Sequence, residues 1–421
     1  MKVVKLKANT AVLSNGVRVV FEQMPHLETV SVGIWVDVGA RHETIDQNGI
    51  SHLLEHMAFK GTARRSAKDI AEEIENVGGH LNAYTSRDHT SYYARVMKDD
   101  LPLGIDMLCD IVRNSRFDED ELLKEKEVVV QEIGQAEDTP DDVVFERFQE
   151  TAFPNQPIGR SILGTVDRVR NFCVDDLAKF QAHHYGSQAM VVAVAGNFDA
   201  NKLIVMLEDA LGDLEQNTSR IVDPARYVGG FHATEKDLEQ SHITLGFPSL
   251  NFNDPNYYAL QVYSTILGGG MSSRLFQEVR ENRGLAYSVY SFVASHSDTG
   301  VFGIYAGTGP DKSKLLFPVV AEEMKKMTDK VEVKEVERAK TQLKAGLLMS
   351  LESTSSRIEQ MGRQMLVHNR PLPVAEMIEK VDAIDKAAVE AVAIQTLEGA
   401  TTVAMVGKNT PHGDIEMMFK A

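Results

Sequence analysis

Cysteine is nearly absent from this chain, which carries only Cys109 and Cys173 among its 421 residues. Two thiols this far apart in the sequence cannot supply a disulfide framework or a cysteine-based metal site. So low a cysteine content is typical of proteins that live in a reducing compartment. Any metal bound by the chain must therefore rely on histidine and carboxylate ligands.

Long apolar runs and an excess of positive charge are also missing. No stretch approaches the roughly 20 apolar residues that a membrane-spanning helix needs, so we expect no membrane partner. The chain has 44 Lys and Arg against 61 Asp and Glu, a formal charge of −17. Nucleic acid is therefore excluded as the main partner, because phosphate binding requires a basic surface. An acidic surface favours basic ligands, although it also simply aids solubility.

The N-terminal region shows none of the usual targeting signals. Residues 10–21 alternate around Ser14-Asn15-Gly16, which predicts two short strands joined by an Asn-Gly hairpin turn. A signal peptide needs a continuous apolar segment, and an organellar presequence is Arg-rich and poor in acids. We therefore expect a bacterial cytoplasmic protein; a mature mitochondrial matrix form is the second expectation.

The chain reads as a repeat of about 200 residues. Each half begins with an apolar alternating run, continues through helices and strands, and closes with a helix followed by a buried strand. These patterns run from Val30 to Ala195 and again from Ile243 to Val406, and they include a predicted helix over 274–281. We expect an α+β fold with two similar domains, each a mostly antiparallel sheet packed with helices. The expected boundaries are 1–215 for the first domain, 216–230 for a linker and 231–421 for the second.

The two halves differ at one helix. His52-Leu-Leu-Glu55-His56 occupies the place that Thr265-Ile-Leu-Gly268-Gly269 takes in the second half. Histidines four residues apart lie on one face of a helix, about 6 Å apart along its axis. Both imidazoles can then bind one tetrahedral Zn²⁺, with Glu55 close by but not a ligand. The alternative is an ordinary amphipathic helix that carries two surface histidines.

A later acidic segment offers a third ligand. Glu125 and Glu132 lie seven residues apart, almost two helical turns, and so share a face. This combination resembles the inverzincins of the M16 peptidase family, such as the catalytic subunit of the mitochondrial processing peptidase and its bacterial homologues. The resemblance implies Zn²⁺ as the cofactor, His52, His56 and Glu132 as its ligands, and Glu55 as the general base. It places Glu125 beside a ligand as a second acid, whereas a solvated acidic helix is the alternative for both glutamates.

Further segments extend this resemblance along the whole chain. Gly78-Gly-His-Leu-Asn82-Ala83-Tyr-Thr85 is similar to the family's substrate-binding edge strand, which implies contacts from Asn82 and Ala83 to a peptide backbone. Arg280 and Tyr287, seven apart in the second half, resemble the family's Arg/Tyr pair that stabilises the oxyanion. Gly268-Gly269-Gly270 matches either the glycine-rich loop of a partner subunit or a plain helix-ending turn.

Two acids bear on specificity. Asp142 and Glu146 lie 10 and 14 residues after Glu132 and coincide with the acidic pair that holds a substrate arginine in the processing peptidase. Their order is reversed here, which leaves the depth of such a pocket open. The residues His183-His184 have no metal-like spacing to a carboxylate and are expected to be structural.

The expected function is that of a zinc metalloendopeptidase acting on peptides or unfolded, presequence-like segments, with a preference for substrates containing Arg. Relatives of this length pair into a clam-shaped dimer, so we expect a homodimer and basic peptide substrates. Two alternatives stand beside this reading. One is a non-catalytic core-type subunit, which usually lacks the ligands present here. The other is a metal-binding partner in a heterodimeric peptidase.

Overall fold

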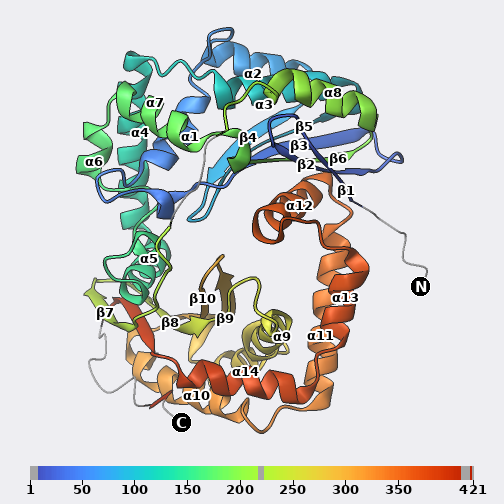
Figure 1. Ribbon diagram of the computed structural model, residues 1–421. Helices are drawn as coiled ribbons and strands as arrows, with labels where there is room; N and C mark the ends of the chain where they lie inside the picture. Colours follow the sequence, from blue (N-terminus) through green and yellow to red (C-terminus); the bar gives the residue numbers. More distant parts are fainter. Residues whose placement is uncertain (1–7, 217–221, 409–417, 420–421) are drawn as a thin grey trace. The chain divides into compact units, whose positions relative to one another are not determined.

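The computed structural model describes residues 8–216, 222–408 and 418–419 (Figure 1). These residues form two compact units. Unit 1 contains 8–133, 161–216, 222 and 348–375, and unit 2 contains the remainder of the described chain. Part of the expected linker, residues 217–221, lies outside the described residues.

Unit 1 is built on a six-stranded sheet in the order β1-β2-β6-β3-β5-β4. Its strands are β1 Asn9–Val12, β2 Arg18–Gln23, β3 Thr29–Val36, β4 His80–Thr85, β5 Thr90–Met97 and β6 Met190–Gly196. The pair β2/β6 is parallel, and all other neighbours in this sheet are antiparallel. The predicted N-terminal hairpin is confirmed, and Gly16 at its turn has φ +96°, a conformation that glycine adopts at little cost.

Unit 2 is built on a five-stranded sheet in the order β7-β11-β8-β10-β9. Its strands are β7 Gly230–Glu235, β8 Ser241–Ser249, β9 Ala286–Ser295, β10 Gly300–Thr308 and β11 Thr402–Gly407. The pair β7/β11 is parallel and the others are antiparallel. Apart from β1, both sheets place their strands in the same chain order and with the same directions. The expected α+β fold with two similar halves is therefore confirmed.

Helices connect the strands in both halves. In the first half they are α1 Ile50–Ala58, α2 Ala67–Asn76, α3 Leu101–Arg113, α4 Glu119–Asp138, α5 Pro140–Ala152, α6 Val166–Asn171, α7 Val174–His184 and α8 Ala200–Leu211. In the second half they are α9 Tyr257–Gly268, α10 Ser313–Lys326, α11 Val333–Ser350, α12 Thr354–His368, α13 Val374–Asp382 and α14 Lys386–Glu398. Short 3₁₀ turns cover Ala40–His42, Lys98–Asp100, Pro157–Gly159, Ser187–Ala189 and Pro310–Lys312.

Each sheet is covered on both faces, which explains the continuous burial of its central strands. In β6, alternate residues enter two different clusters: Val192 and Val194 pack with the core around α1 and α3, whereas Val191 and Ala193 pack with α12. Because side chains of a strand alternate between faces, these clusters lie on opposite sides of the sheet. A strand buried in this way reads as an unbroken apolar run, as residues 190–195 do.

The helix that covers the second face of each sheet comes from the other half of the sequence. In unit 1, α12 packs on β2, β3 and β6, and in unit 2, α5 packs on β7, β8 and β11. A Cβ at Gly362 of α12 would lie 2.5 Å from the Trp35 ring, so only glycine allows this close approach. In α5, Val144 and Phe148 are almost completely buried, each contributing about 1.5–3 kcal/mol.

This exchange departs from the expected domain boundaries at 215 and 231, which treated each half as one continuous domain. Residues 134–160 belong to unit 2 and residues 348–375 to unit 1. The physical reason is that the apolar face of α5 packs on the sheet of unit 2, whereas that of α12 packs on the sheet of unit 1. Helical periodicity predicts an apolar face but does not say which sheet covers it.

Among the described residues, no helix is both long enough and apolar enough to cross a lipid bilayer.

Candidate metal centre

Helix α1 presents two histidines because its other side chains anchor it in the core. Ile50, Leu53, Leu54 and Met57 are at most 2% exposed and form its buried stripe. His52, Glu55 and His56 lie off this stripe and are half-buried. The amphipathic pattern that served as the alternative reading is thus present, and it is what orients the histidine face.

The start of α1 is fixed by a buried carboxylate. Glu43, only 2% exposed, accepts hydrogen bonds from the backbone N–H groups of Gly49 and Ser51, both at 2.9 Å. Asn48 donates a third hydrogen bond at 3.1 Å through its side-chain amide. These bonds satisfy N–H groups that have no partner within the helix, and a carboxylate there also matches the helix dipole. Glu43 therefore sets where the histidine-bearing helix begins.

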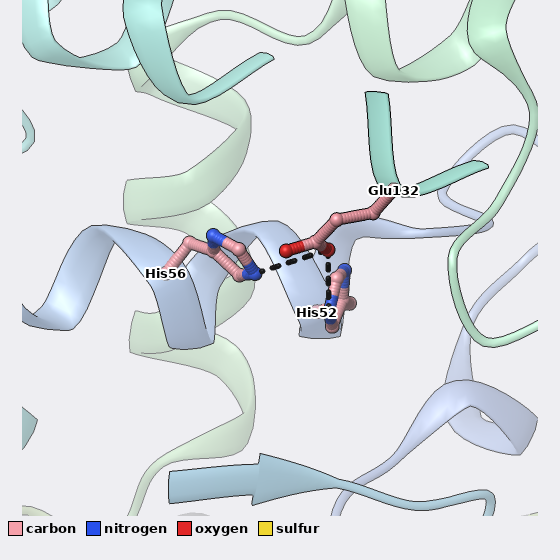
Figure 2. A group of neighbouring side chains, drawn as sticks. All are labelled: His52, His56 and Glu132. Atoms are coloured by element: carbon pink, nitrogen blue, oxygen red, sulfur yellow. Dashed lines mark ion pairs between the residues drawn. The ribbon is translucent and has the colours of Figure 1, made fainter. Parts of the chain in front are cut away.

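Three side chains converge on one point in unit 1 (Figure 2). Glu132 Oε2, from α4, lies 3.6 Å from His52 Nε2 and 3.5 Å from His56 Nε2. One ligand atom from each of the three residues lies within 4.8 Å of the others, so the group can hold a metal ion. A tetrahedral ion with bonds of about 2.1 Å separates its ligand atoms by about 3.4 Å. The two N···O distances agree with that spacing.

Glu125 supports this group through His56. The Nδ1 atom of His56 lies 3.1 Å from Glu125 Oε2, and Lys60 Nζ lies 2.6 Å from Glu125 Oε1. With its hydrogen on Nδ1, His56 donates to Glu125 and keeps the Nε2 lone pair facing Glu132. Such a carboxylate fixes the orientation of a metal-binding imidazole and raises its basicity. The structure therefore brings Glu125 next to a candidate ligand, and its role in orienting that ligand stays a prediction.

The two histidines differ in their tendency to hold a proton. Burial, assisted by the neighbouring His56, lowers the pKa of His52 to about 4, so His52 is neutral near pH 7. Burial also opposes the charged form of His56, but the Glu125 hydrogen bond and the surrounding carboxylates outweigh it and raise the pKa of that imidazole. Burial raises the pKa of Glu125, but His56 and Lys60 lower it by more. The pKa of Glu125 is therefore lowered overall. The group thus combines a neutral imidazole, a carboxylate-bonded imidazole and a carboxylate.

Glu55 lies on the same helix as the two histidines but outside the ligand set. Thr85, the last residue of β4, donates a hydrogen bond to Glu55 Oε2 at 2.5 Å. Burial raises the pKa of Glu55, whereas the Thr85 hydrogen bond and His56 oppose the rise. The contact between Thr85 and Glu55 was not predicted from the sequence, although Thr85 is the last residue of the segment that resembles the family's substrate-binding edge strand. The contact of Lys60 with Glu125 was also not predicted from the sequence.

Asn82 and Ala83 lie on β4, the strand that also carries Thr85. The strand order puts β4 at the edge of its sheet, with β5 as its single neighbour. Its outer backbone groups can therefore accept an additional extended strand. Asn82 is exposed and its side-chain oxygen accepts a hydrogen bond from the N–H of Ala83. Substrate contacts at these two residues stay a prediction.

Arg280 and Tyr287 lie together in unit 2, each at a local irregularity of the backbone. The predicted helix over 274–281 is instead a π-helix, Phe276–Asn282, which carries Arg280. Tyr287 occupies a β-bulge, because Ser288 pairs with Gly307 while Ala286 pairs with Thr308. Both irregularities redirect side chains and are frequent near functional sites. The Arg280 guanidinium lies 4.8 Å from the Tyr287 ring centre, and that tyrosine is 74% exposed.

The remaining specificity candidates also lie in unit 2. Asp142 and Glu146 are one turn apart on α5, with Asp142 exposed and Glu146 half-buried. Their helical spacing agrees with the sequence-based expectation. Their role in binding arginine stays a prediction, as does the role of Arg280 and Tyr287 at the metal group.

Known proteins resemble this chain along both halves. Residues 18–166 match the family described as insulinase (peptidase family M16), and residues 171–343 match the peptidase M16 inactive domain. An uncharacterized zinc protease of Rickettsia felis is 40% identical over 406 residues, covering 96% of this chain and 98% of the relative.

Two solved structures share the fold. A protease from Helicobacter pylori has a TM-score of 0.90 at 23% identity and covers 96% of this chain and 100% of its own. A chain of Complex III2 from Candida albicans has a TM-score of 0.88 at 23% identity, covering 98% and 100%. At these identities the likeness shows the fold alone. The matches to both halves and the 40% identity over nearly the full length place this chain in peptidase family M16, the insulinase family.

Proposed function

We propose that the chain is a zinc-dependent endopeptidase with His52, His56 and Glu132 as the metal ligands. The observation that carries the proposal is the convergence of these ligand atoms at the spacing of a tetrahedral ion, with Glu55 beside them. Three protein ligands leave a fourth position open, as a catalytic zinc site requires. Relatives named zinc proteases support zinc as the ion.

Within this proposal, each nearby side chain has a defined task. A zinc ion held by His52, His56 and Glu132 would be a Lewis acid, able to polarise a peptide carbonyl and to make water a stronger nucleophile. Glu55 accepts the proton of the attacking water and later delivers it to the leaving amine. Thr85 holds the Glu55 carboxylate by its hydrogen bond, and Glu125 holds His56. Arg280 and Tyr287 donate hydrogen bonds to the oxyanion.

The proposed substrates are peptides or unfolded, presequence-like segments that bind in an extended form. The open edge of β4 supports this, because an added strand would pair along Asn82 and Ala83. We further propose a homodimer in the bacterial cytoplasm, acting without a nucleic acid or membrane partner. The net charge of −17 argues against a nucleic-acid partner, and the small number of cysteines fits a cytoplasmic protein.

Peptidase activity of the purified chain tests the proposal against its alternatives. We expect the zinc-loaded chain alone to cleave internal bonds of unstructured peptides, to stop when a chelator removes zinc, and to recover on adding it back. A non-catalytic core-type subunit would show no cleavage under any condition. A metal-binding partner of a heterodimeric peptidase would bind zinc and gain activity only with a second chain. Either result would overturn the proposal.

Glu125→Gln should weaken zinc binding about tenfold or more, because the His56 imidazole loses its charged hydrogen-bond partner. Competition with a chelator measures the affinity. Glu127→Gln is the matched control, since Glu127 lies on the same helix, is 59% exposed and pairs with Arg170 at the surface. Unchanged zinc affinity in Glu125→Gln would show that Glu125 does not orient the ligand.

Peptides with arginine near the cleaved bond should be preferred over matched peptides in which glutamine replaces it. The Asp142→Asn/Glu146→Gln variant should lose this preference while still cleaving the neutral peptide, because each carboxylate can bind a guanidinium. The preference should also fall with added salt, which screens such contacts. A ratio of kcat/KM values for the two peptides measures it.

The control for this experiment is Glu137→Gln/Glu150→Gln, which removes the same number of negative charges from exposed positions nearby. It should keep the preference. If the parent chain cleaves both peptides equally well, the acidic pair has no role in arginine recognition.

A further inference from the structure

A cavity in unit 2 is lined in part by Arg280 and Tyr287, and the function proposed above assigns no ligand to the rest of its space. Its volume is about 360 Å³, and Gln240, Lys312 and residues 284–286 and 307–309 complete its walls. This volume is at the lower end of the range for ligand sites and suits a single side chain or a chain end. Gly284 and Gly309 add to the open space, because a Cβ at either would meet no atom within 4 Å.

The charge of the cavity is opposite to that of the protein as a whole. Arg280 and Lys312 line it, and none of the described residues in its lining is acidic. In a chain with 61 acidic and 44 basic residues, a cavity whose described lining holds two cations and no acidic residue favours an anionic ligand. The positive charge of the lining therefore predicts that the ligand is an anion.

Lys312 is well placed to supply one of these charges. Its Nζ donates a hydrogen bond to the carbonyl oxygen of Gly284 at 2.7 Å, which uses one of its three N–H groups. Within the described part of the chain, it forms no ion pair with a carboxylate. The contact with Gly284 holds the ammonium group at the cavity while two donors remain for a ligand.

Arg280 is held in place by aromatic rings. Its guanidinium carbon lies 4.7 Å from the Phe276 ring centre and 4.8 Å from that of Tyr287. Rings that pack against a guanidinium leave its edge, where the N–H donors lie, for other partners. In the described part of the chain, its Nε forms an ion pair with a Glu281 carboxylate oxygen at 3.7 Å, too far for a strong hydrogen bond.

We propose that this cavity is a carboxylate-binding subsite for the peptide substrate, with Lys312 as its specificity-determining residue. The inference rests on the proposed peptidase function and adds a substrate class to it, namely peptides that carry a carboxylate where the chain passes Arg280. Two sources offer the same chemistry: the C-terminal carboxylate of the peptide and the side chain of Asp or Glu.

Binding to the zinc-loaded Glu55→Gln chain tests the subsite without relying on turnover. The probes are three fluorescein-labelled peptides of one sequence: a free C-terminal acid, its C-terminal amide, and the amide with one Gln→Glu change. We expect one of the two carboxylate-bearing peptides to bind about fivefold more tightly than the plain amide. Preference for the free acid identifies the chain end, and preference for the Glu-containing amide identifies the side chain.

Variants at Lys312 separate its charge from its structural contact. Lys312→Gln keeps a donor for the Gly284 carbonyl but removes the charge, and it should reduce the preference to about onefold. Lys312→Arg should retain the preference. Lys314→Gln is the matched control, because Lys314 is exposed on the same segment and does not line the cavity.

The outcomes distinguish this subsite from the proposed peptidase activity. Equal binding of all three peptides, including no measurable binding of any, overturns the subsite even if the parent chain is an active peptidase. Retention of the preference in Lys312→Gln also overturns it. A carboxylate preference that depends on Lys312 supports the subsite even if the parent chain cleaves no peptide, a result that would count against the peptidase function alone.

Discussion

Glu55→Gln is expected to retain one zinc ion per chain and to lose at least ~10² in kcat. Glu55 lies outside the group of ligand atoms formed by His52, His56 and Glu132, so its replacement leaves the proposed coordination intact. Glutamine keeps an oxygen that can accept the hydrogen bond from Thr85. It cannot take a proton from water at neutral pH, and the chemical step slows. Zinc analysis of the purified protein and single-substrate kinetics measure the two effects.

Ligand variants provide the contrast for this prediction. His56→Ala and Glu132→Gln should lose zinc affinity together with activity, because each removes one of three donors. Far-ultraviolet circular dichroism establishes that these variants remain folded. Loss of stoichiometric zinc in Glu55→Gln would show that Glu55 is a ligand and that the assignment of the base is wrong. Nearly full activity in Glu55→Gln would show that another group accepts the proton.

The metal group was predictable from the sequence because its geometry is mostly local. Positions 52 and 56 face the same way on any α-helix, and positions 125 and 132 do so on another. The resemblance to M16 peptidases then implied that these two helices supply ligands to the same zinc ion. The structure brings His52, His56 and Glu132 to one point, and their role as zinc ligands stays a prediction.

Contacts between distant elements escaped the sequence analysis. Thr85 bonds to Glu55 across 30 residues, and Lys60 pairs with Glu125 across 65. Separations of 30 and 65 residues match no helical or strand repeat. Nothing in the sequence therefore distinguishes Thr85 or Lys60 from an ordinary surface residue. Only the packing of β4 and α4 against α1 brings the partners together.

Backbone irregularities were missed for a related reason. The residues of the π-helix at 276–282 also suit an α-helix, so composition does not predict the change in hydrogen bonding. The bulge at Tyr287 depends on how β9 aligns with β10, and that register is a tertiary property. The exchange of α5 and α12 between units follows the same logic, because an apolar helix face can pack on either of two similar sheets.

Another prediction with a large expected effect is about which subunit's zinc site Arg280 and Tyr287 complete. The sequence repeat places the metal ligands in one half of the chain and this pair in the other. In longer relatives, as the family resemblance implies, two further units separate the zinc-bearing unit from the one that carries the Arg/Tyr pair. A symmetric dimer of this chain would supply four units. We therefore expect each zinc site to be completed by Arg280 and Tyr287 of the partner subunit.

A subunit-mixing experiment distinguishes this arrangement from a site completed within one chain. Glu55→Gln and Tyr287→Phe homodimers should each be nearly inactive, because every site lacks either its base or an oxyanion donor. The two variants are mixed in equal amounts and allowed to exchange subunits. Exchange is verified independently with differently tagged chains, and mixing each variant with itself controls for any effect of the procedure.

Random exchange makes half of the dimers mixed, and each mixed dimer then contains one site in which both residues are intact. That site joins the Glu55 of the Tyr287→Phe chain to the Tyr287 of the Glu55→Gln chain. Activity should recover to roughly a quarter of the parent value if the two sites act independently. When both residues work within one chain, every site keeps one damaged residue and mixing recovers nothing. Verified exchange without recovery would thus refute the shared site, while the assignment of His52, His56 and Glu132 would be unaffected.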